Sequence, residues 1–309
     1  MKYTIASLLF VTGLFLSSSV FAQTLIIDED FSDGDFTNNP TWTDSESKHI
    51  VNGSNRLQLD APSESAEAVI STTSTAAYGE WEAYIELDFN PSSSNLSRIY
   101  VIANQQDMKG DINGYFVQIG DTEDEVSLYR QDGSSTTKII DGTDGLVDTD
   151  PVTVRIRVTR DLNGNWELFA DPTGGTSYNS QGTSTDDTYA QSDFIGLFSD
   201  YTSTRSSLFE YDDIKVTKVN PPLDIQSVTV VDTQTIDVAF NLDVDPASVQ
   251  PSDFTITPNV GNPDNTSTSG NVVELVFNNS ISGDEYTLNV SDITDSDGNT
   301  IAPNTEFDF

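Results

Sequence analysis

Apolar side chains recur at every second position along most of this chain, and this period constrains the fold more than any other feature. In WEAYIELDF (81–89) the odd-numbered residues are apolar, and the even-numbered ones are acidic except Tyr84. In VTVRIRVT (152–159) valine and isoleucine alternate with polar residues, including Arg155 and Arg157. A period of two places alternate side chains on opposite faces of a strand. Helical periodicity is nearly absent, so the pattern predicts an all-β protein.

The strands are short and separated by turn residues, which is typical of β-sandwiches. Asn163-Gly164 stands between two alternating runs and predicts a two-residue hairpin. Strands that are apolar on one face only indicate antiparallel sheets. Further strands are expected at 56–60, 67–72, 98–104, 115–120, 126–130 and 194–198.

The N-terminal 22 residues have the composition of a secretory signal peptide. Lys2 precedes a short apolar run, and small residues stand before a cleavage point near Ala22. About a dozen apolar residues are too few to span a bilayer as a helix, so we expect cleavage rather than a membrane anchor. The mature chain is therefore expected to be secreted or displayed at the cell surface, without membrane insertion. It has no cysteine and must fold without disulfides.

The chain is strongly acidic, with 50 acidic and 13 basic residues and a formal charge of −37. Such a surface repels nucleic acid and anionic lipid, so neither is an expected partner. Most of the acids fit solubility in a salty medium, where charges are screened over a few ångströms. A few clustered carboxylates are candidates for calcium ligands.

Two prolines, Pro221 and Pro222, mark a domain boundary, because proline cannot donate a ladder hydrogen bond and keeps a linker stiff. We expect a first domain at 23–219, a linker at 220–222 and a second domain at 223–309. The second domain is short and suits a small Ig-like sandwich. Its strands are expected at 225–231, 235–242, 253–257, 272–277 and 285–290, with a polar loop at 262–271 and a turn at 292–300.

Two adjacent aspartates interrupt the strand LFEYDDIKV (208–216). Phe209 and Tyr211 share one parity, whereas Ile214 and Val216 share the other. All four can face a core only if a β-bulge at Asp212-Asp213 inserts one residue.

The bulge is either purely structural or part of a metal site. In the second interpretation Asp28 and Asp30, on the first strand, join Asp212 and Asp213 in an oxygen-rich structural calcium site.

Catalytic patterns are incomplete. Glu86 and Asp88 have the spacing of the first two acids of a retaining glycosidase, but the third position is Asn90, which cannot donate the required proton. We therefore expect Glu86 and Asp88 to be solvated acids on an outer face, and we assign no catalytic residue. The single histidine, His49, lies in a polar, turn-like segment and is expected at the surface.

Sugar binding is harder to dismiss, because carbohydrate sites on sandwiches combine aromatic rings with polar side chains. GYFVQIG (114–120) and SLYRQDG (127–133) are expected to be sequential antiparallel strands. They supply the candidate ligand-binding residues Tyr115, Gln118, Tyr129 and Arg130. Exposed tyrosines are also ordinary in β-structure.

Residues 25–219 resemble the concanavalin A-like lectin/glucanase superfamily, of the laminin-G-like jelly-roll kind. The resemblance rests on DEDFSDGDF, YGEWEAYIELDF, NGYFVQIGDTEDEVSLYRQDG and FIGLFSDYTSTRSSLFEYDDIKV. It implies an antiparallel jelly-roll β-sandwich, frequent calcium binding, and glycan binding or hydrolysis. Residues 223–309 resemble a bacterial Ig-like domain of the S-layer type through TIDVAFNLDVDPASVQPSDFTI, NVVELVFNNSISGDEYTLNV and DITDSDGNTI, which implies spacing or adhesion.

Together these features predict an exported, non-catalytic protein that binds a carbohydrate or another surface ligand and carries an Ig-like spacer. A divergent glycoside hydrolase or polysaccharide lyase is the alternative, and a purely structural adhesin segment is a second one. The chain is either released freely or is the front portion of a longer polypeptide.

Overall fold

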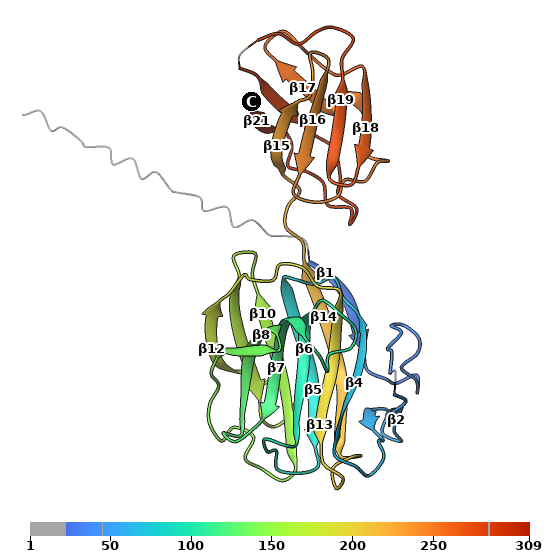
Figure 1. Ribbon diagram of the computed structural model, residues 1–309, viewed down its shortest axis with the longest axis vertical. Helices are drawn as coiled ribbons and strands as arrows, with labels where there is room; N and C mark the ends of the chain where they lie inside the picture. The colour runs from blue at the N-terminus through green and yellow to red at the C-terminus, as the bar shows by residue number, and fades with distance from the viewer. Residues whose placement is uncertain (1–22, 45, 284) are drawn as a thin grey trace, which may run out of the picture.

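The computed structural model describes residues 23–44, 46–283 and 285–309. The proposed signal peptide lies outside the described residues. Within them the chain forms strands and a single short 3-10 turn, η1 (Pro251–Asp253), and every strand pair is antiparallel (Figure 1). The expected all-β fold class is confirmed.

The first domain is a sandwich of two sheets. Sheet A has eight strands in the order β12-β11-β10-β5-β14-β3-β2, with β1 paired to β14. Its strands are β1 (Gln23–Glu29), β2 (His49–Val51), β3 (Leu57–Leu59), β5 (Gly79–Leu87), β10 (Val152–Arg160), β11 (Asn165–Asp171), β12 (Asn179–Thr185) and β14 (Phe209–Val219). Sheet B has six strands in the order β4-β13-β6-β7-β8-β9. They are β4 (Ala66–Thr73), β6 (Leu96–Ala103), β7 (Ile112–Gly120), β8 (Glu125–Gly133), β9 (Ser135–Ile140) and β13 (Phe194–Tyr201).

The main core lies between the two sheets and contains the alternating apolar residues that the sequence pattern selects. Trp81 and Trp166, on β5 and β11, stack at 5.9 Å between ring centroids. Glu86 and Asp88 point away from this core, as expected. A hairpin is present at Asn163-Gly164, with Gly164 in the left-handed region at φ +73°. Its turn is longer than the two residues expected, because Arg160 pairs with Trp166 and the Asp161 N–H bonds to the Asn165 carbonyl.

The predicted bulge in β14 is also confirmed. Asp212 pairs with Tyr84 and Lys215 pairs with Glu82, so two β14 residues stand opposite one residue of β5. Asp213 adopts φ +48°, and both Tyr211 and Ile214 are fully buried. The slip in parity therefore keeps apolar residues inside on either side of the aspartates.

A fully buried arginine closes one end of the sandwich. Arg160, the last residue of β10, donates to the carbonyls of Ala77, Tyr189 and Asp186 at 2.9, 2.7 and 3.0 Å, and to Asp187 Oδ1 at 2.7 Å. Its guanidinium also lies within 5.1 Å of the ring centroids of three aromatic residues, Tyr78, Tyr115 and Trp166. These contacts fasten the segment 186–190 to the sandwich.

A second, smaller apolar cluster covers the outer face of sheet B. Tyr100, Phe116 and Phe198 lie on this face, and Met108 from the loop 104–111 packs over them. Gly196 permits the contact, because a Cβ at that position would lie 2.3 Å from Met108 Sδ. This loop thus seals part of the outer face.

His49 is not at the surface, and that expectation was wrong. Its side chain is fully buried, with Nδ1 3.1 Å from Asp44 Oδ2. The same Asp44 oxygen accepts the backbone N–H of His49 at 2.7 Å. A short strand, β2, begins at His49 and pairs with β3, which turns the polar segment inward.

The second domain has its own core, which begins at Leu223. One sheet is β15 (Ile225–Val230), β16 (Thr235–Phe240), β19 (Val272–Val276) and β18 (Asn265–Ser269), and the other is β17 (Phe254–Thr257), β20 (Thr287–Val290) and β21 (Thr305–Asp308). The polar loop expected at 262–271 instead contains β18, whose residues pair with β19. Serine and threonine alternate on this edge strand, and its side chains are largely exposed. The sequence therefore has no apolar alternation that would predict a strand there.

Candidate functional site

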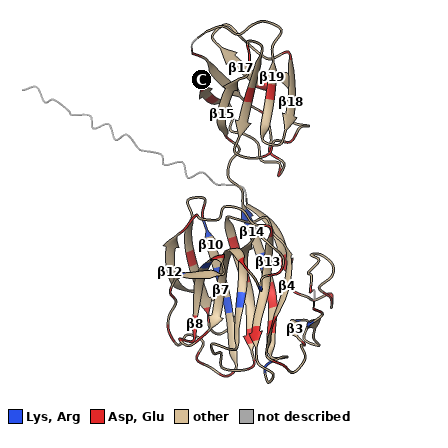
Figure 2. Cartoon of the chain, viewed as in Figure 1, with Lys and Arg blue, Asp and Glu red and all other residues tan. Residues whose placement is uncertain are grey.

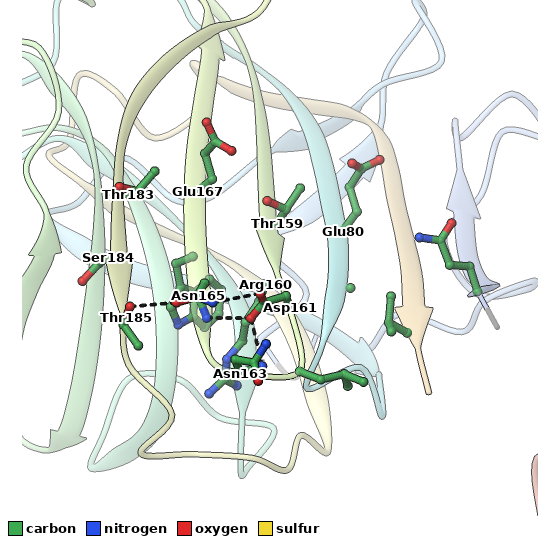
Figure 3. A pocket seen from close by; sticks show the side chains of 15 residues that line it. Glu80, Thr159, Arg160, Asp161, Asn163, Asn165, Glu167, Thr183, Ser184 and Thr185 are labelled. Atoms are coloured by element: carbon green, nitrogen blue, oxygen red, sulfur yellow. Dashed lines mark hydrogen bonds between the residues drawn. The ribbon is translucent and has the colours of Figure 1, made fainter. Parts of the chain in front are cut away.

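A groove of about 1430 Å³ lies on the outer side of sheet A, at the end that carries the β10–β11 hairpin (Figure 3). Strands β5, β10, β11 and β12 supply most of its lining, and the ends of β1 and β14 complete it. This volume is larger than a single sugar ring and lies above the range of about 300–1,000 Å³ that is typical of small-molecule sites.

One row of polar side chains runs across the groove. Ladder pairing places Glu80 opposite Thr159, Thr159 opposite Glu167, and Glu167 opposite Thr183. Figure 3 shows these four residues following one another on adjacent strands. Neighbouring strands are about 4.8 Å apart, so the row presents acceptors and hydroxyls over roughly 14 Å on a rigid support.

The hairpin turn forms a fixed wall at the end of the groove. Asp161 accepts the backbone N–H groups of Asn163 and Asn165, both at 2.9 Å, and the Asn165 side-chain amide at 2.9 Å. Asn165 Oδ1 in turn accepts the Thr185 hydroxyl at 2.8 Å. Burial raises the pKa of Asp161, but the hydrogen bonds from Asn165 and Asn163 outweigh it, and the net shift is downward.

The charged side chains that line the groove are acidic, with the exception of Arg160. Burial, together with the nearby charge of Glu82, raises the pKa of Glu80, although Arg157 lies 4.0 Å from its Oε2 and opposes this shift. Glu167 accepts the Ser180 hydroxyl at 3.3 Å and otherwise faces solvent. The Arg160 guanidinium is turned inward to the buried contacts described above. A ligand of this groove must therefore be neutral or cationic.

Two of the four predicted ligand-binding residues, Tyr115 and Arg130, serve the sandwich itself. The strands that carry the four, β7 and β8, do pair as expected. Tyr115 is fully buried, packs against Trp166 at 4.7 Å and donates to Asp186 Oδ1 at 2.6 Å. Arg130 forms ion pairs with Asp132 and Asp186. The ring of Tyr115 thus presents no face to a ligand, because its parity is that of the core.

Gln118 and Tyr129 lie on the opposite, outer face of sheet B. Gln118 is only 5% exposed and accepts the Arg98 Nε–H at 3.0 Å. Tyr129 is half-buried and stacks on Phe116 with centroids 5.1 Å apart. The structure therefore does not bring the four residues to one exposed surface.

The four predicted calcium ligands do not form an oxygen cage, because each has another partner. Asp213 pairs with Arg155 at 2.5 Å, and Asp28 lies 3.4 Å from Lys215 Nζ. Asp212 lies 3.8 Å from Arg56 Nε, and Asp30 accepts the Ser32 backbone N–H within its own turn. These residues do not fit a calcium site.

Another acidic group, Glu123, Glu125 and Asp141, has carboxylate oxygens within 4.8 Å of one another. The ammonium of Lys138 lies 3.2, 2.5 and 2.6 Å from these three residues. The lysine occupies the place that a cation would take. The DSDGN turn likewise closes on Asp295, which accepts from Asp297 and Asn299, as expected.

Glu86 and Asp88 line a small pocket of about 250 Å³ with Glu210. Arg56 Nη1 contacts Glu86 Oε2 at 2.6 Å and Glu210 Oε2 at 3.1 Å. Tyr84 also donates to Glu86 Oε2, at 2.6 Å. Glu86 and Glu210 therefore share one guanidinium, so neither of these two carboxylates is without a partner.

Residue types alone did not reveal the groove, because its lining is threonine, asparagine and scattered acids. A signal was nevertheless present in the alternation. Glu80 and Thr159 have outward parity in strands whose inward residues are unambiguous, and Glu167 has the outward parity of β11. What the sequence did not contain is the order of the strands, which places these residues in one row.

Comparison with protein families finds one match. Residues 212–309 match the family model of a bacterial Ig-like domain, Big_5. This confirms the Ig-like expectation for the C-terminal part of the chain. The first residues of the match, 212–219, belong to β14 of sheet A. No curated protein matches the chain.

The chain is also similar to solved structures, three of which are as follows. The carbohydrate recognition domain of Emp47p is 10% identical, with a TM-score of 0.47, and the match covers 63% of this chain and 95% of that one. The Ca2+/Man2-bound form of the VIP36 exoplasmic/lumenal domain is 11% identical, with a TM-score of 0.46 and coverages of 63% and 87%. Carbohydrate binding module CBM66 from Bacillus subtilis is 10% identical, with a TM-score of 0.42 and coverages of 57% and 94%.

Among the residues that the structure describes, no helix has the length and apolarity needed to cross a membrane.

Proposed function

We propose that the first domain binds a neutral polysaccharide in the groove on sheet A, without cleaving it. The observation that carries this proposal is the row Glu80, Thr159, Glu167 and Thr183 across four strands. Sugars offer hydroxyl groups at regular intervals, and carboxylates and threonine hydroxyls are suitable partners for them. Hydrogen bonds to a charged acceptor contribute about 1.5–3 kcal/mol each.

The rigid support favours binding further. The side chains project from paired strands and not from free loops, so little conformational entropy is lost when a ligand orders them. Phe169, two residues after Glu167 on the same strand face, lies beside the row, and the Arg157 guanidinium covers its ring at 4.4 Å from the centroid. The part of the ring that stays exposed adds an apolar contact next to the hydroxyl partners.

We further propose that the chain is exported, that its first domain is of the concanavalin A-like kind, and that the Ig-like domain acts as a spacer. The two antiparallel sheets of the first domain agree with this assignment, and so do the acidic residues in both domains (Figure 2). The pocket at Glu86 lacks a free carboxylate pair, which supports binding without hydrolysis.

The test is a glycan array with the full chain, followed by calorimetric titration with the neutral oligosaccharides that bind. Glu167→Ala should weaken binding about tenfold or more. Glu274→Ala in the Ig-like domain is the matched control, because Glu274 also lies on a strand and also accepts a serine hydroxyl at 3.3 Å. Unchanged affinity in Glu167→Ala would remove the groove as the site.

Two further outcomes separate the alternatives. Silence across a broad array would favour a structural adhesin segment. Release of reducing sugar that disappears in Glu86→Gln would favour a divergent hydrolase or lyase at the small pocket, against the proposal.

A further inference from the structure

The opposite face of the sandwich contains an arginine that has no ion pair among the residues that the structure describes. Of the lysines and arginines that the structure describes, all form ion pairs within 4.0 Å except Arg98 and Arg205. In a chain with a formal charge of −37 this is unusual. Arg98 lies on β6, an inner strand of sheet B, and is partly exposed on the outer face.

The Arg98 side chain is held in one orientation. Its Cζ lies 4.9 Å from the ring centroid of Phe116 and 5.1 Å from that of Phe198. Its Nε–H donates to Gln118 Oε1 at 3.0 Å, and Gln118 Nε2 donates to Asp121 Oδ2 at 3.1 Å. The two terminal nitrogens of the guanidinium are left without a carboxylate partner. A planar, oriented fork of this kind matches the two oxygens of a carboxylate.

Two acids stand beside this arginine. Asp200 on β13 stands directly opposite Glu67 on β4 in the strand ladder. Two residues earlier on β13, Phe198 stands opposite Arg98 on β6. Burial raises the pKa of Asp200, and the Arg98 charge only partly offsets that shift. Like charges directly opposite each other destabilise a sheet. Because Asp200 and Glu67 lie beside Arg98, their carboxylates can accept hydrogen bonds from sugar hydroxyl groups next to the guanidinium that would bind a carboxylate.

We propose that this face binds a uronic acid residue of an acidic glycan, with its carboxylate on Arg98 and its hydroxyls on Asp200 and Glu67. Tyr129, half-buried and stacked on Phe116, provides an aromatic flank on the far side. The site lies on the sheet opposite the groove and takes a ligand of different charge, so it goes beyond the function proposed above. One domain would then contact neutral and acidic sugars on its two faces.

The probes are cellobiouronate and cellobiose, which differ only in a carboxylate in place of a hydroxymethyl group. Titrated into the full chain, cellobiouronate should bind at least tenfold more tightly than cellobiose at this site. Arg98→Gln should abolish that preference. Arg98→Lys, which keeps the charge but loses the fork, should reduce it several-fold.

Arg205→Gln is the matched control, because Arg205 also has no ion pair and lies over a phenylalanine ring, 5.2 Å from Phe89. It should leave the preference unchanged, and so should Glu167→Ala in the groove. Equal binding of the two disaccharides would overturn the inference, and so would a preference that survives in Arg98→Gln. Acetate competing as strongly as cellobiouronate would overturn the sugar contacts. The same comparison in the Glu167→Ala chain, whose groove is weakened, separates this face from the groove, so that the outcome does not depend on whether the groove binds neutral glycan.

Discussion

Replacing Arg160 with methionine should destabilise the first domain strongly. The substitution keeps a long, flexible side chain but removes the four hydrogen bonds of a fully buried guanidinium. The carbonyls of Ala77 and Tyr189 lose this donor, whereas the Asp186 carbonyl keeps Trp166 Nε1 at 2.9 Å. Each buried acceptor without a partner costs about 1–3 kcal/mol.

The cation–aromatic contacts with three rings are lost as well, each contributing about 0.5–2 kcal/mol. Release of the buried charge offsets part of the loss, since desolvating an ion is costly. We therefore expect the free energy of unfolding to fall by about 3–5 kcal/mol. For a domain of this size, about 2–4 °C of melting temperature accompany each kcal/mol, so the melting temperature should fall by about 6–20 °C.

Tryptophan fluorescence is the appropriate measurement, because all 3 tryptophans of the chain, Trp42, Trp81 and Trp166, are buried in the first domain. A denaturant titration followed by tryptophan fluorescence therefore measures the unfolding of the first domain, even if the two domains unfold separately. Arg155→Met is the matched control: its partner Asp213 has a side chain 46% exposed, and the loss should stay below about 1 kcal/mol. A cost below 1 kcal/mol in Arg160→Met would refute the reasoning.

Three other perturbations test separate parts of the structure. Glu29 is buried with an unpartnered Oε2, and burial raises its pKa to about 6 from 4.5. Ionisation of Glu29 therefore destabilises the fold above pH 6. Glu29→Gln should increase the free energy of unfolding by about 2 kcal/mol at pH 8 but not at pH 4, as melting curves at the two pH values would show. Chelator should leave the melting temperature unchanged because Lys138 already compensates its acidic neighbours; a drop that calcium reverses would contradict this. Gly114→Ala should lower the free energy of unfolding by about 1–3 kcal/mol or more in denaturant titrations, because the new Cβ would lie 1.9 Å from the Ile102 carbonyl oxygen. A melting curve like that of the unchanged chain would contradict this close approach.

Sequence periodicity was sufficient to predict the fold class, because each strand residue of a sandwich faces either the core or the outside, and the core side selects apolar side chains. The parity of Phe209 and Tyr211 against Ile214 and Val216 required one inserted residue, and β14 contains it at Asp212-Asp213. A strand that buries little lacks this signal. The serines and threonines of β18 are an example, since only their ladder with β19 defines them as a strand.

The candidate sites were less predictable, because they depend on strand order and on pairs distant in sequence. Arg160 has the inward parity of Val158, but arginine is rarely buried, and its acceptors come from segments about 26 to 83 residues away. Tyr115 lies in a run that is apolar on both faces, so alternation could not tell which side it takes. The buried position of His49 accompanies a contact with Asp44, through the backbone N–H and Nδ1, that composition alone does not indicate.

The contact between Met108 and Gly196 gives one position unusual influence over the outer face of sheet B. A single methyl group at residue 196 would collide with the methionine sulfur, and the flexible end of the Met108 side chain would have to move away from this position. Variation at residue 196 therefore changes how Met108 covers the aromatic residues, while the strands below keep their pairing. Among relatives of this chain, a side chain larger than glycine at position 196 should be accompanied by a smaller or differently placed side chain at position 108.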